Sequence, residues 1–139
     1  MKRTSGSWNS YIDNLIAMSP ACDRGCIIGL DGGEKWTSDS HPNALKITPT
    51  EGATIARAFK AKDFSTFRSN GIVVAGIKYH FLRVEDDKVV FGKKKGYGAI
   101  TLQSSKTAIV IGHTKEGGQQ GDTNQAVDFI AGYFESLGL

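Results

Sequence analysis

The stretch that decides the fold, residues 71–112, reads GIVVAGIKYHFLRVEDDKVVFGKKKGYGAITLQSSKTAIVIG. Its short apolar runs are interrupted by glycine, aspartate and serine, which favour turns over continued strands. Runs separated by so few residues pair antiparallel, because a parallel crossover needs about a dozen residues or more. The stretch therefore predicts an antiparallel meander. We expect its strands at 72–75, 77–85, 88–93, 99–103 and 107–112.

Amphipathic helices are predicted toward both ends of the chain. Residues 7–16 place their apolar side chains on one arc, and Ser7 can serve as the N-cap. The last helix follows a loop rich in glycine and glutamine at 116–124, and Asp122 with Gln125 resembles a capping box at its start. Its apolar arc contains Ala126, Val127, Phe129, Ile130, Tyr133, Phe134 and Leu137.

The segment between the first helix and the meander contains further elements. Residues 24–30 form a buried apolar run, and the turn 31–33 predicts a hairpin whose returning strand is 35–37. Thr48, Pro49 and Glu51 form a strong helix start, so we expect a helix from there to about Phe59. Residues 63–68 favour another helical turn. The economical packing is an α+β fold, with terminal helices on one face of an antiparallel sheet.

Length and composition indicate one globular domain. The chain has 139 residues, of which 40% are hydrophobic and 22% charged, so it can bury a core without disulfide or metal support. Residues 1–6 are polar, and we expect them to form a flexible extension before a domain at 7–139. Apolar runs such as 72–75 have four residues, far short of a membrane span. Cys22 and Cys26 are too few for a disulfide framework, which favours a reduced, cytoplasmic protein.

Charge is distributed unevenly along the chain. The net charge is +3, but residues 57–115 carry twelve Lys or Arg against four Asp or Glu, whereas residues 116–139 carry four acids and no Lys or Arg. The basic middle suits an acidic protein surface, phosphoinositide headgroups or nucleic acid. A solvated surface without a partner explains the same pattern.

Signatures of catalysis are missing from the sequence. No phosphate-binding loop or nucleophile elbow occurs, and His41, His80 and His113 share no metal-ligand spacing. Residues 118–121 match the Gly-x-x-Gly loop of an RNA-binding KH domain, but that module needs a different order of elements. We therefore predict a binding protein with no catalytic residue, metal or cofactor.

Four aromatic residues suggest what is bound. Trp8 and Tyr11 share one helix face, Trp36 lies in the predicted hairpin, and Tyr133 lies on the last helix. Side by side, these rings would line a groove for a proline-rich segment, whose extended helix is already formed and whose carbonyls accept from indole and phenol groups. Aromatic residues at helical spacing are also common in cores, and pattern alone leaves that alternative open.

Several motifs resemble those of the profilin family. Residues 8–15 (WNSYIDNL) are similar to the profilin N-terminal signature, and 26–32 leading to Trp36 are similar to its first hairpin. Residues 91–94, 107–112 and 132–139 follow in the family's order. The resemblance covers about residues 7–139. It implies a profilin domain in which an antiparallel sheet carries the N- and C-terminal helices on one face and shorter helices on the other.

The resemblance also implies three binding sites. The polyproline site would comprise Trp8, Tyr11, Trp36, Tyr133 and Leu139. The site for monomeric actin would comprise Lys78, His80, Phe81, Arg83, Lys93, Lys94, Gly118, Gln119, Gly121, Asn124 and Asp128. Phosphoinositides would contact Arg83, Lys93, Lys94 and Lys95.

The function implied is a monomeric, cytoplasmic and cytoskeleton-associated regulator of actin polymerisation that promotes nucleotide exchange on actin and binds proline-rich proteins such as formins. Gln119 stands where vertebrate members of the family commonly have a histidine, and Gln125 and Phe129 replace a lysine and a glutamate of the family. These departures motivate an alternative, a signalling adaptor that binds proline-rich peptides and phosphoinositides with weak or no actin binding. An RNA-binding module is a more distant rival, and we expect no nucleic-acid partner.

Overall fold

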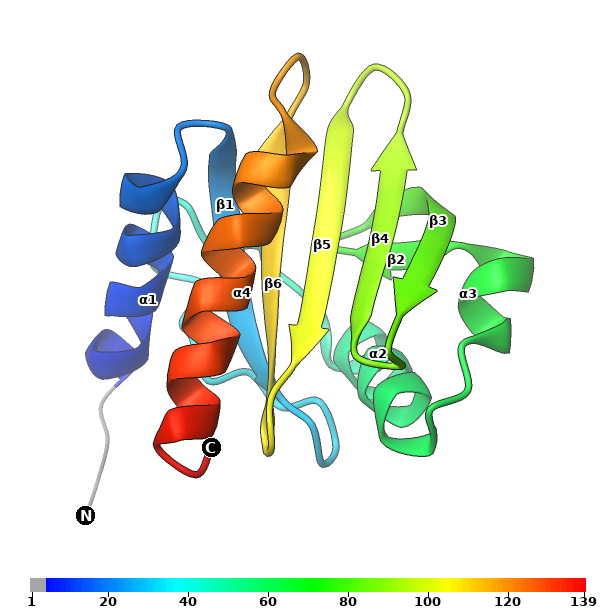
Figure 1. Cartoon of the computed structure of the whole chain (residues 1–139), viewed down its shortest axis with the longest axis horizontal. Helices are drawn as coiled ribbons and strands as arrows, with labels where there is room; N and C mark the ends of the chain where they lie inside the picture. Colours follow the sequence, from blue (N-terminus) through cyan, green and yellow to red (C-terminus); the bar gives the residue numbers. More distant parts are fainter. Residues whose placement is uncertain (1–4) are drawn as a thin grey trace.

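The computed structural model describes residues 5–139, with side chains from Trp8 onward. It contains a six-stranded antiparallel sheet with helices on both faces (Figure 1). The elements in chain order are α1 Ser5–Met18, β1 Cys22–Gly29, α2 Pro49–Ala61, α3 Ser65–Asn70, β2 Ile72–Val74, β3 Ile77–Glu85, β4 Val89–Lys94, β5 Gly98–Ser104, β6 Ala108–Lys115 and α4 Gln120–Ser136.

The predicted meander is confirmed. Strands β2 to β6 pair in sequence order, and β1 joins β6 to give the sheet order β1-β6-β5-β4-β3-β2. A register shift between Phe81 and Arg83 marks a bulge in the β3–β4 pair, and a second shift lies between Cys22 and Arg24 in β1. The order places β1, from early in the chain, beside the last strand, so the elements next to both termini meet at one end of the sheet.

Two hydrophobic clusters hold the helices to the two faces. On one face, α1 and α4 pack over β1, β5 and β6, around Leu15, Ile27, Val110, Val127 and Phe134 (Figure 1). On the other face, α2 and α3 cover a larger cluster. That cluster includes Cys26, Ile28, Ile55, Phe59, Phe67, Tyr79, Ile100, Leu102 and Ile111. Terminal helices on one face and shorter helices on the other are thus confirmed.

A pair of glycines allows the terminal helices to approach the sheet closely. Gly25 of β1 lies opposite Gly112 of β6. A Cβ at Gly25 would come within 2.6 Å of Leu15 on α1, and one at Gly112 within 2.9 Å of Val127 on α4. Because real Cβ atoms do not approach so closely, a side chain at either position would force the Leu15 or Val127 side chain to shift.

The predicted helix starts have different outcomes. Thr48 caps α2 in a reciprocal capping box with Glu51, as expected. Helix α1 begins at Ser5, so Ser7 is not its N-cap; of the predicted flexible extension, residues 1–4 lie outside the described residues. The N-cap of α4 is Gln119, which makes no side-chain capping bond, so the capping box predicted for Asp122 and Gln125 is wrong.

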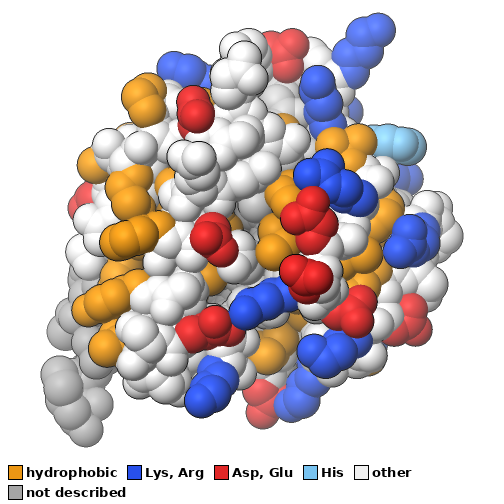
Figure 2. All heavy atoms as spheres, viewed as in Figure 1, with side chains coloured by type: hydrophobic (Ala, Val, Ile, Leu, Met, Phe, Trp, Pro, Cys, Tyr) orange, Lys and Arg blue, Asp and Glu red, His pale blue; other side chains and the backbone are white. Residues whose placement is uncertain are grey.

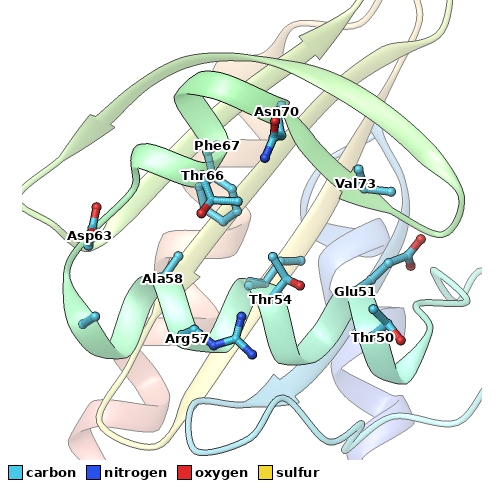
Figure 3. A pocket seen from close by; sticks show the side chains of 13 residues that line it. Thr50, Glu51, Thr54, Arg57, Ala58, Asp63, Thr66, Phe67, Asn70 and Val73 are labelled. Atoms are coloured by element: carbon cyan, nitrogen blue, oxygen red, sulfur yellow. The ribbon is translucent and has the colours of Figure 1, made fainter.

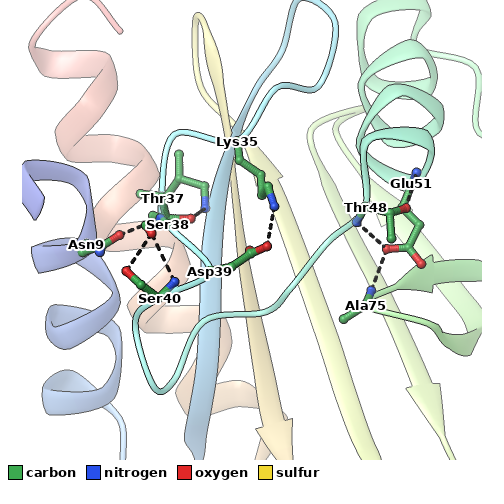
Figure 4. A network of polar contacts seen from close by, with 10 residues as sticks. Asn9, Lys35, Thr37, Ser38, Asp39, Ser40, Thr48, Glu51 and Ala75 are labelled. Atoms are coloured by element: carbon green, nitrogen blue, oxygen red, sulfur yellow. Dashed lines mark hydrogen bonds and ion pairs between the residues drawn. The ribbon is translucent and has the colours of Figure 1, made fainter. Parts of the chain in front are cut away.

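The predicted hairpin after β1 is reduced to a single bridge between Ile28 and Lys35. The backbone N–H of Trp36 donates to Ile27, and the Thr37 hydroxyl accepts from the N–H of Ile27. Side-chain contacts then hold the segment: Ser38 N–H donates to Asn9 of α1, and Lys35 pairs with Asp39 (Figure 4). Residues 35–37 are therefore a tethered loop rather than a strand.

Glu51 connects the start of α2 to the turn after β2 (Figure 4). Its Oε1 accepts from the backbone N–H groups of Thr48 and Ala75, and its Oε2 accepts from Gly76. One carboxylate thus serves both a helix start and a strand turn, which positions α2 against the sheet edge.

Candidate binding surfaces

An aromatic cluster lies where α1, α4 and the loop after β1 meet. The Trp8 ring centroid is 4.6 Å from that of Trp36 and 6.0 Å from that of Tyr11, and Tyr11 lies 6.4 Å from Tyr133. Phe134 forms the floor of the cluster, with edge-on contacts to Trp8 at 5.8 Å and to Tyr11 at 4.8 Å. Such tilted and edge-on geometries are favourable for aromatic rings.

Local structure explains why these rings converge. Trp8 and Tyr11 are three residues apart on α1, so they lie on one side of that helix. Tyr133 and Phe134 are neighbours on α4, where Phe134 is fully buried and Tyr133 is half exposed. Trp8, Tyr11 and Trp36 are partly buried, so the rings keep an edge toward solvent while resting on the core.

All five residues predicted for the polyproline site come together here. Leu139 packs against the hydrophobic cluster that includes Phe134, and its backbone N–H donates to the Phe134 carbonyl at 2.8 Å. The carbonyl oxygen of Leu139 accepts from Ser105 Oγ at 2.8 Å and from Thr107 Oγ1 at 3.0 Å. The sequence places Phe134 in the apolar arc of the last helix but does not identify it as the floor of the site. The only signal for that role is its position next to Tyr133.

Most of the residues predicted for actin binding lie on the open part of the same sheet face, beyond α4, but Phe81 and Lys94 point to the other face. Lys78 and His80 are exposed on β3 and alternate with Tyr79 and Phe81, which contact the opposite cluster. His80 lies opposite Lys93 in the β3–β4 pair. Phe81 therefore faces away from Lys78, His80 and Lys93, and the Arg68 guanidinium lies 4.9 Å from the centre of its ring.

Arg83 follows the bulge in β3 and is already engaged. Its Nε donates to Glu85 at 2.9 Å, and its guanidinium lies 4.3 Å from the centre of the Phe91 ring. The Arg83 guanidinium is thus paired with Glu85 and lies over the Phe91 ring. Because the pair is exposed to solvent, it contributes little to stability.

Polar side chains of α4 border this open face. Asn124 Oδ1 accepts from the Thr101 hydroxyl, and Asp128 Oδ1 accepts from Gln103 Nε2 at 2.9 Å. Gln120 donates to the Ile100 carbonyl at 3.1 Å. In Figure 2 the right half of the molecule shows interspersed basic and acidic side chains. Gly118, Gln119 and Gly121 lie in the loop before α4 and its first turn, at the upper edge of this face in Figure 1.

The lysine triplet predicted for phosphoinositides does not form one flat patch. Lys93 and Lys94 are successive residues of β4, so their side chains leave opposite faces of the sheet. Lys95 lies in the following turn, and all three are exposed. Only Lys93 shares a face with Arg83.

A pocket that the sequence did not predict lies between α2 and α3 (Figure 3). Its volume is about 590 Å³, with Ile55, Ala58 and Phe67 among its lining. Thr54 of α2 points across the gap toward Thr66 and Asn70 (Figure 3). The sequence contains no signal for this pocket, because its lining comes from two helices and a strand, and no local pattern specifies how these elements pack.

Ionisable groups in the described residues are not arranged for catalysis. Burial raises the pKa of the Cys22 thiol to about 11 and that of Cys26 still further, so both stay protonated and unreactive. His113 contacts Asp23 at 2.6 Å and His41 contacts Asp13 at 2.7 Å, at separate places in the fold. Among these residues no cluster of three metal-ligating side chains occurs, and no helix could cross a membrane.

Comparisons with known proteins agree on one family. The Profilin family model matches residues 6–139. A profilin of Heliocidaris crassispina is 61% identical over 139 residues, covering 96% of this chain and 99% of the relative. The crystal structure of Acanthamoeba castellanii profilin II has a TM-score of 0.81 at 34% identity, covering 95% of this chain and 99% of that one. Mouse profilin IIa in complex with a double repeat from the FH1 domain of mDia1 has a TM-score of 0.74 at 24% identity, covering 95% and 99%.

Proposed function

This chain belongs to the profilin family, and from that membership we propose that it carries actin monomers to proline-rich assembly factors and promotes nucleotide exchange on actin. Profilins are non-enzymatic, actin-binding regulators of the cytoskeleton, so the chain is not an enzyme. The proposal specifies the two sites, the exchange activity and a monomeric, cytoplasmic protein.

One observation carries the proposal: α4 separates two surfaces of different chemistry. Tyr133 faces the α1 side with the aromatic cluster, whereas Asn124 and Asp128 face β5 and the basic strands. Positions 124 and 128 share one side of the helix and position 133 lies on the other, because each residue advances the helix by about 100°. An actin monomer and a proline-rich segment can therefore bind together without sharing side chains.

The aromatic cluster suits a proline-rich ligand. Trp8, Tyr11, Trp36 and Tyr133 offer flat apolar faces, and such a ligand enters with little loss of entropy because its extended helix is preformed. The FH1 segment bound by the mouse relative supports formins as partners of this chain. We assign the site to these four residues and Leu139.

We assign the actin site to the open sheet face and the polar side of α4. Lys78, His80 and Lys93 lie together on the exposed strands. They suit an acidic partner such as actin, since opposite charges raise the association rate and set specificity. Arg83 and the loop and helix residues Gly118, Gln119, Gly121, Asn124 and Asp128 border this surface. Lys94 follows Lys93 at the end of β4, with its side chain on the opposite face of the sheet. Phe81 acts indirectly, by supporting β3 from below.

Phosphoinositide binding is the third part of the proposal. Lys93, Lys94 and Lys95 surround one strand end, and Arg83 lies on the same face as Lys93. Because Arg83, Lys93 and Lys94 are assigned to both sites, lipid and actin would compete. Sedimentation with vesicles containing phosphatidylinositol bisphosphate tests this part; equal binding by wild type and by a variant with alanine at residues 93–95 would refute it.

Titration against monomeric actin tests the main proposal. We expect inhibition of spontaneous assembly at micromolar concentrations, about −8 kcal/mol of binding, together with faster release of actin-bound nucleotide. If neither effect occurs while polyproline binding is intact, the protein is instead an adaptor for proline-rich peptides. Gln119, Gln125 and Phe129 would then be the substitutions to revert.

A pair of variants tests whether the two sites are separate. Trp8→Ala should abolish polyproline binding and leave actin affinity unchanged, and Lys93→Glu should do the opposite. Lys46→Glu, a charge reversal at an exposed lysine before α2, is the matched control and should change neither. Loss of both activities in either site variant would contradict the two-surface arrangement.

A further inference from the structure

Hydrophobic side chains continue from the aromatic cluster along the junction of α1 and α4. Figure 2 shows them as a column on the left of the view, over these two helices. On α4, Phe129 lies one turn before Tyr133, and these side chains are 64% and 45% exposed. Met18, at the end of α1, is 41% exposed. The two helices run antiparallel, so the end of α1 lies beside the first half of α4 (Figure 1).

A pocket occupies this end of the junction. Its volume is about 460 Å³, and it is lined by Met18, Pro20, Asp122, Gln125, Ala126 and Phe129. Four of these residues are apolar, and Gln125 carries an amide that can donate to a carbonyl. Proline-rich segments present carbonyls without internal partners between apolar rings, so the pocket has the same two kinds of group that the aromatic cluster offers them.

We propose that the pocket at Met18 and Phe129 is a second subsite for the proline-rich ligand, so that one segment lies along the whole α1–α4 junction. The proposal rests on the proposed function, since it extends the site at Trp8 and Tyr133. Its ligand is a long, uncharged proline-rich segment, because the column is continuous with the aromatic cluster and consists mainly of apolar side chains (Figure 2).

The distance between the two subsites sets the ligand length. Trp8 and Met18 are ten residues apart on α1, roughly 15 Å at the helical rise. A polyproline helix rises about 3.1 Å per residue, so about five further prolines reach the second subsite. Triproline, about 9 Å long, is too short to bridge the two subsites and should occupy the aromatic cluster alone, whereas dodecaproline, about 37 Å long, should occupy both.

Calorimetric titration of triproline and dodecaproline tests the proposal. Phe129→Ser should leave triproline binding unchanged and weaken dodecaproline binding about three- to tenfold, the size expected for losing part of one buried apolar side chain. Comparing each variant with wild type on the same peptide removes the advantage of the longer peptide's extra binding registers. Val73→Ser, at an exposed apolar residue of β2, is the matched control and should bind both peptides as wild type does.

The outcomes separate this proposal from the function on which it rests. If wild type binds neither peptide, the polyproline site itself is wrong. If wild type binds triproline but Phe129→Ser does not change dodecaproline binding, only the second subsite is refuted. As a direct readout, the Met18 methyl resonance should shift with dodecaproline and not with triproline. A concentration-dependent dimer that Phe129→Ser abolishes, without a change in peptide affinity, would assign the column to self-association instead.

Discussion

The two sides of α4 differ in how they are held and in what they present. Toward α1, Phe134 is buried beneath Trp8, Tyr11 and Trp36, and the contacts are between rings. Toward β5, Asn124 and Asp128 make directed hydrogen bonds to strand side chains. The side of α4 toward α1 is stabilised by buried apolar area, whereas hydrogen bonds between polar side chains orient the side toward β5. Two ligand surfaces can thus share one helix while responding differently to mutation.

The largest effect on stability should follow from removing the buried ring on the α1 side of α4. Phe134→Ala removes a fully buried ring and should lower the free energy of unfolding by about 3–5 kcal/mol, because the rigid surroundings leave a cavity. Chemical denaturation followed by tryptophan fluorescence measures the change. Phe129→Ala, on the exposed part of the same helix, is the control and should change stability little. Similar losses for the two variants would remove the distinction between core and surface.

A smaller effect is expected on the polar side. Asp128→Ala leaves the buried amide of Gln103 without its acceptor, at a cost of about 1–2 kcal/mol. Denaturation midpoints measure this cost, and Gln125→Ala, at an exposed position of α4, serves as the control. A loss as large as that of Phe134→Ala would mean that hydrogen bonds, rather than packing, hold the helix.

The ion pair at the end of α4 should contribute less still. Lys88 Nζ lies 2.8 Å from Glu135 Oε2, and both side chains are well exposed. A double-mutant cycle of Lys88→Met and Glu135→Gln should give a coupling of about 0.2–1 kcal/mol that falls as salt is added, because solvent screens exposed pairs. A coupling that is independent of salt would indicate a buried interaction.

The smallest effect is a change in stability at acid pH, and it involves residues outside α4. A hydrogen bond from Lys60 lowers the pKa of Asp31, and one from the Ser65 backbone lowers that of Asp63, both below an ordinary value of 3.8. The stability from each is fully present above that value and is lost as pH falls through the lower, folded pKa. Asp31→Asn and Asp63→Asn should therefore flatten the acid limb of a stability profile slightly. A change near neutral pH would contradict this assignment.

A structural feature could be predicted from the sequence where the residues that form it lie close together in the chain. The capping box at Thr48 was predictable because both partners lie within three residues. The start of α4 was mispredicted: Asp122 and Gln125 carry the capping pattern, but the helix begins earlier, where Gln120 bonds to β5. The apolar arc predicted for α4 includes Phe129, Tyr133 and Leu137, yet these side chains are exposed, because the arc is wider than the face that the sheet covers.

The sequence by itself determined the meander, the helices and the family, because alternating apolar residues, turn residues and the WNSYIDNL motif act over short distances. The tertiary structure alone decided which residues meet: Trp36 against Trp8, Phe134 beneath both, Phe81 turned from its neighbours, and the pocket beside Phe129. These contacts join residues far apart in the chain. They depend on the sheet order and on the close approach of both terminal helices to Gly25 and Gly112, which no local pattern encodes.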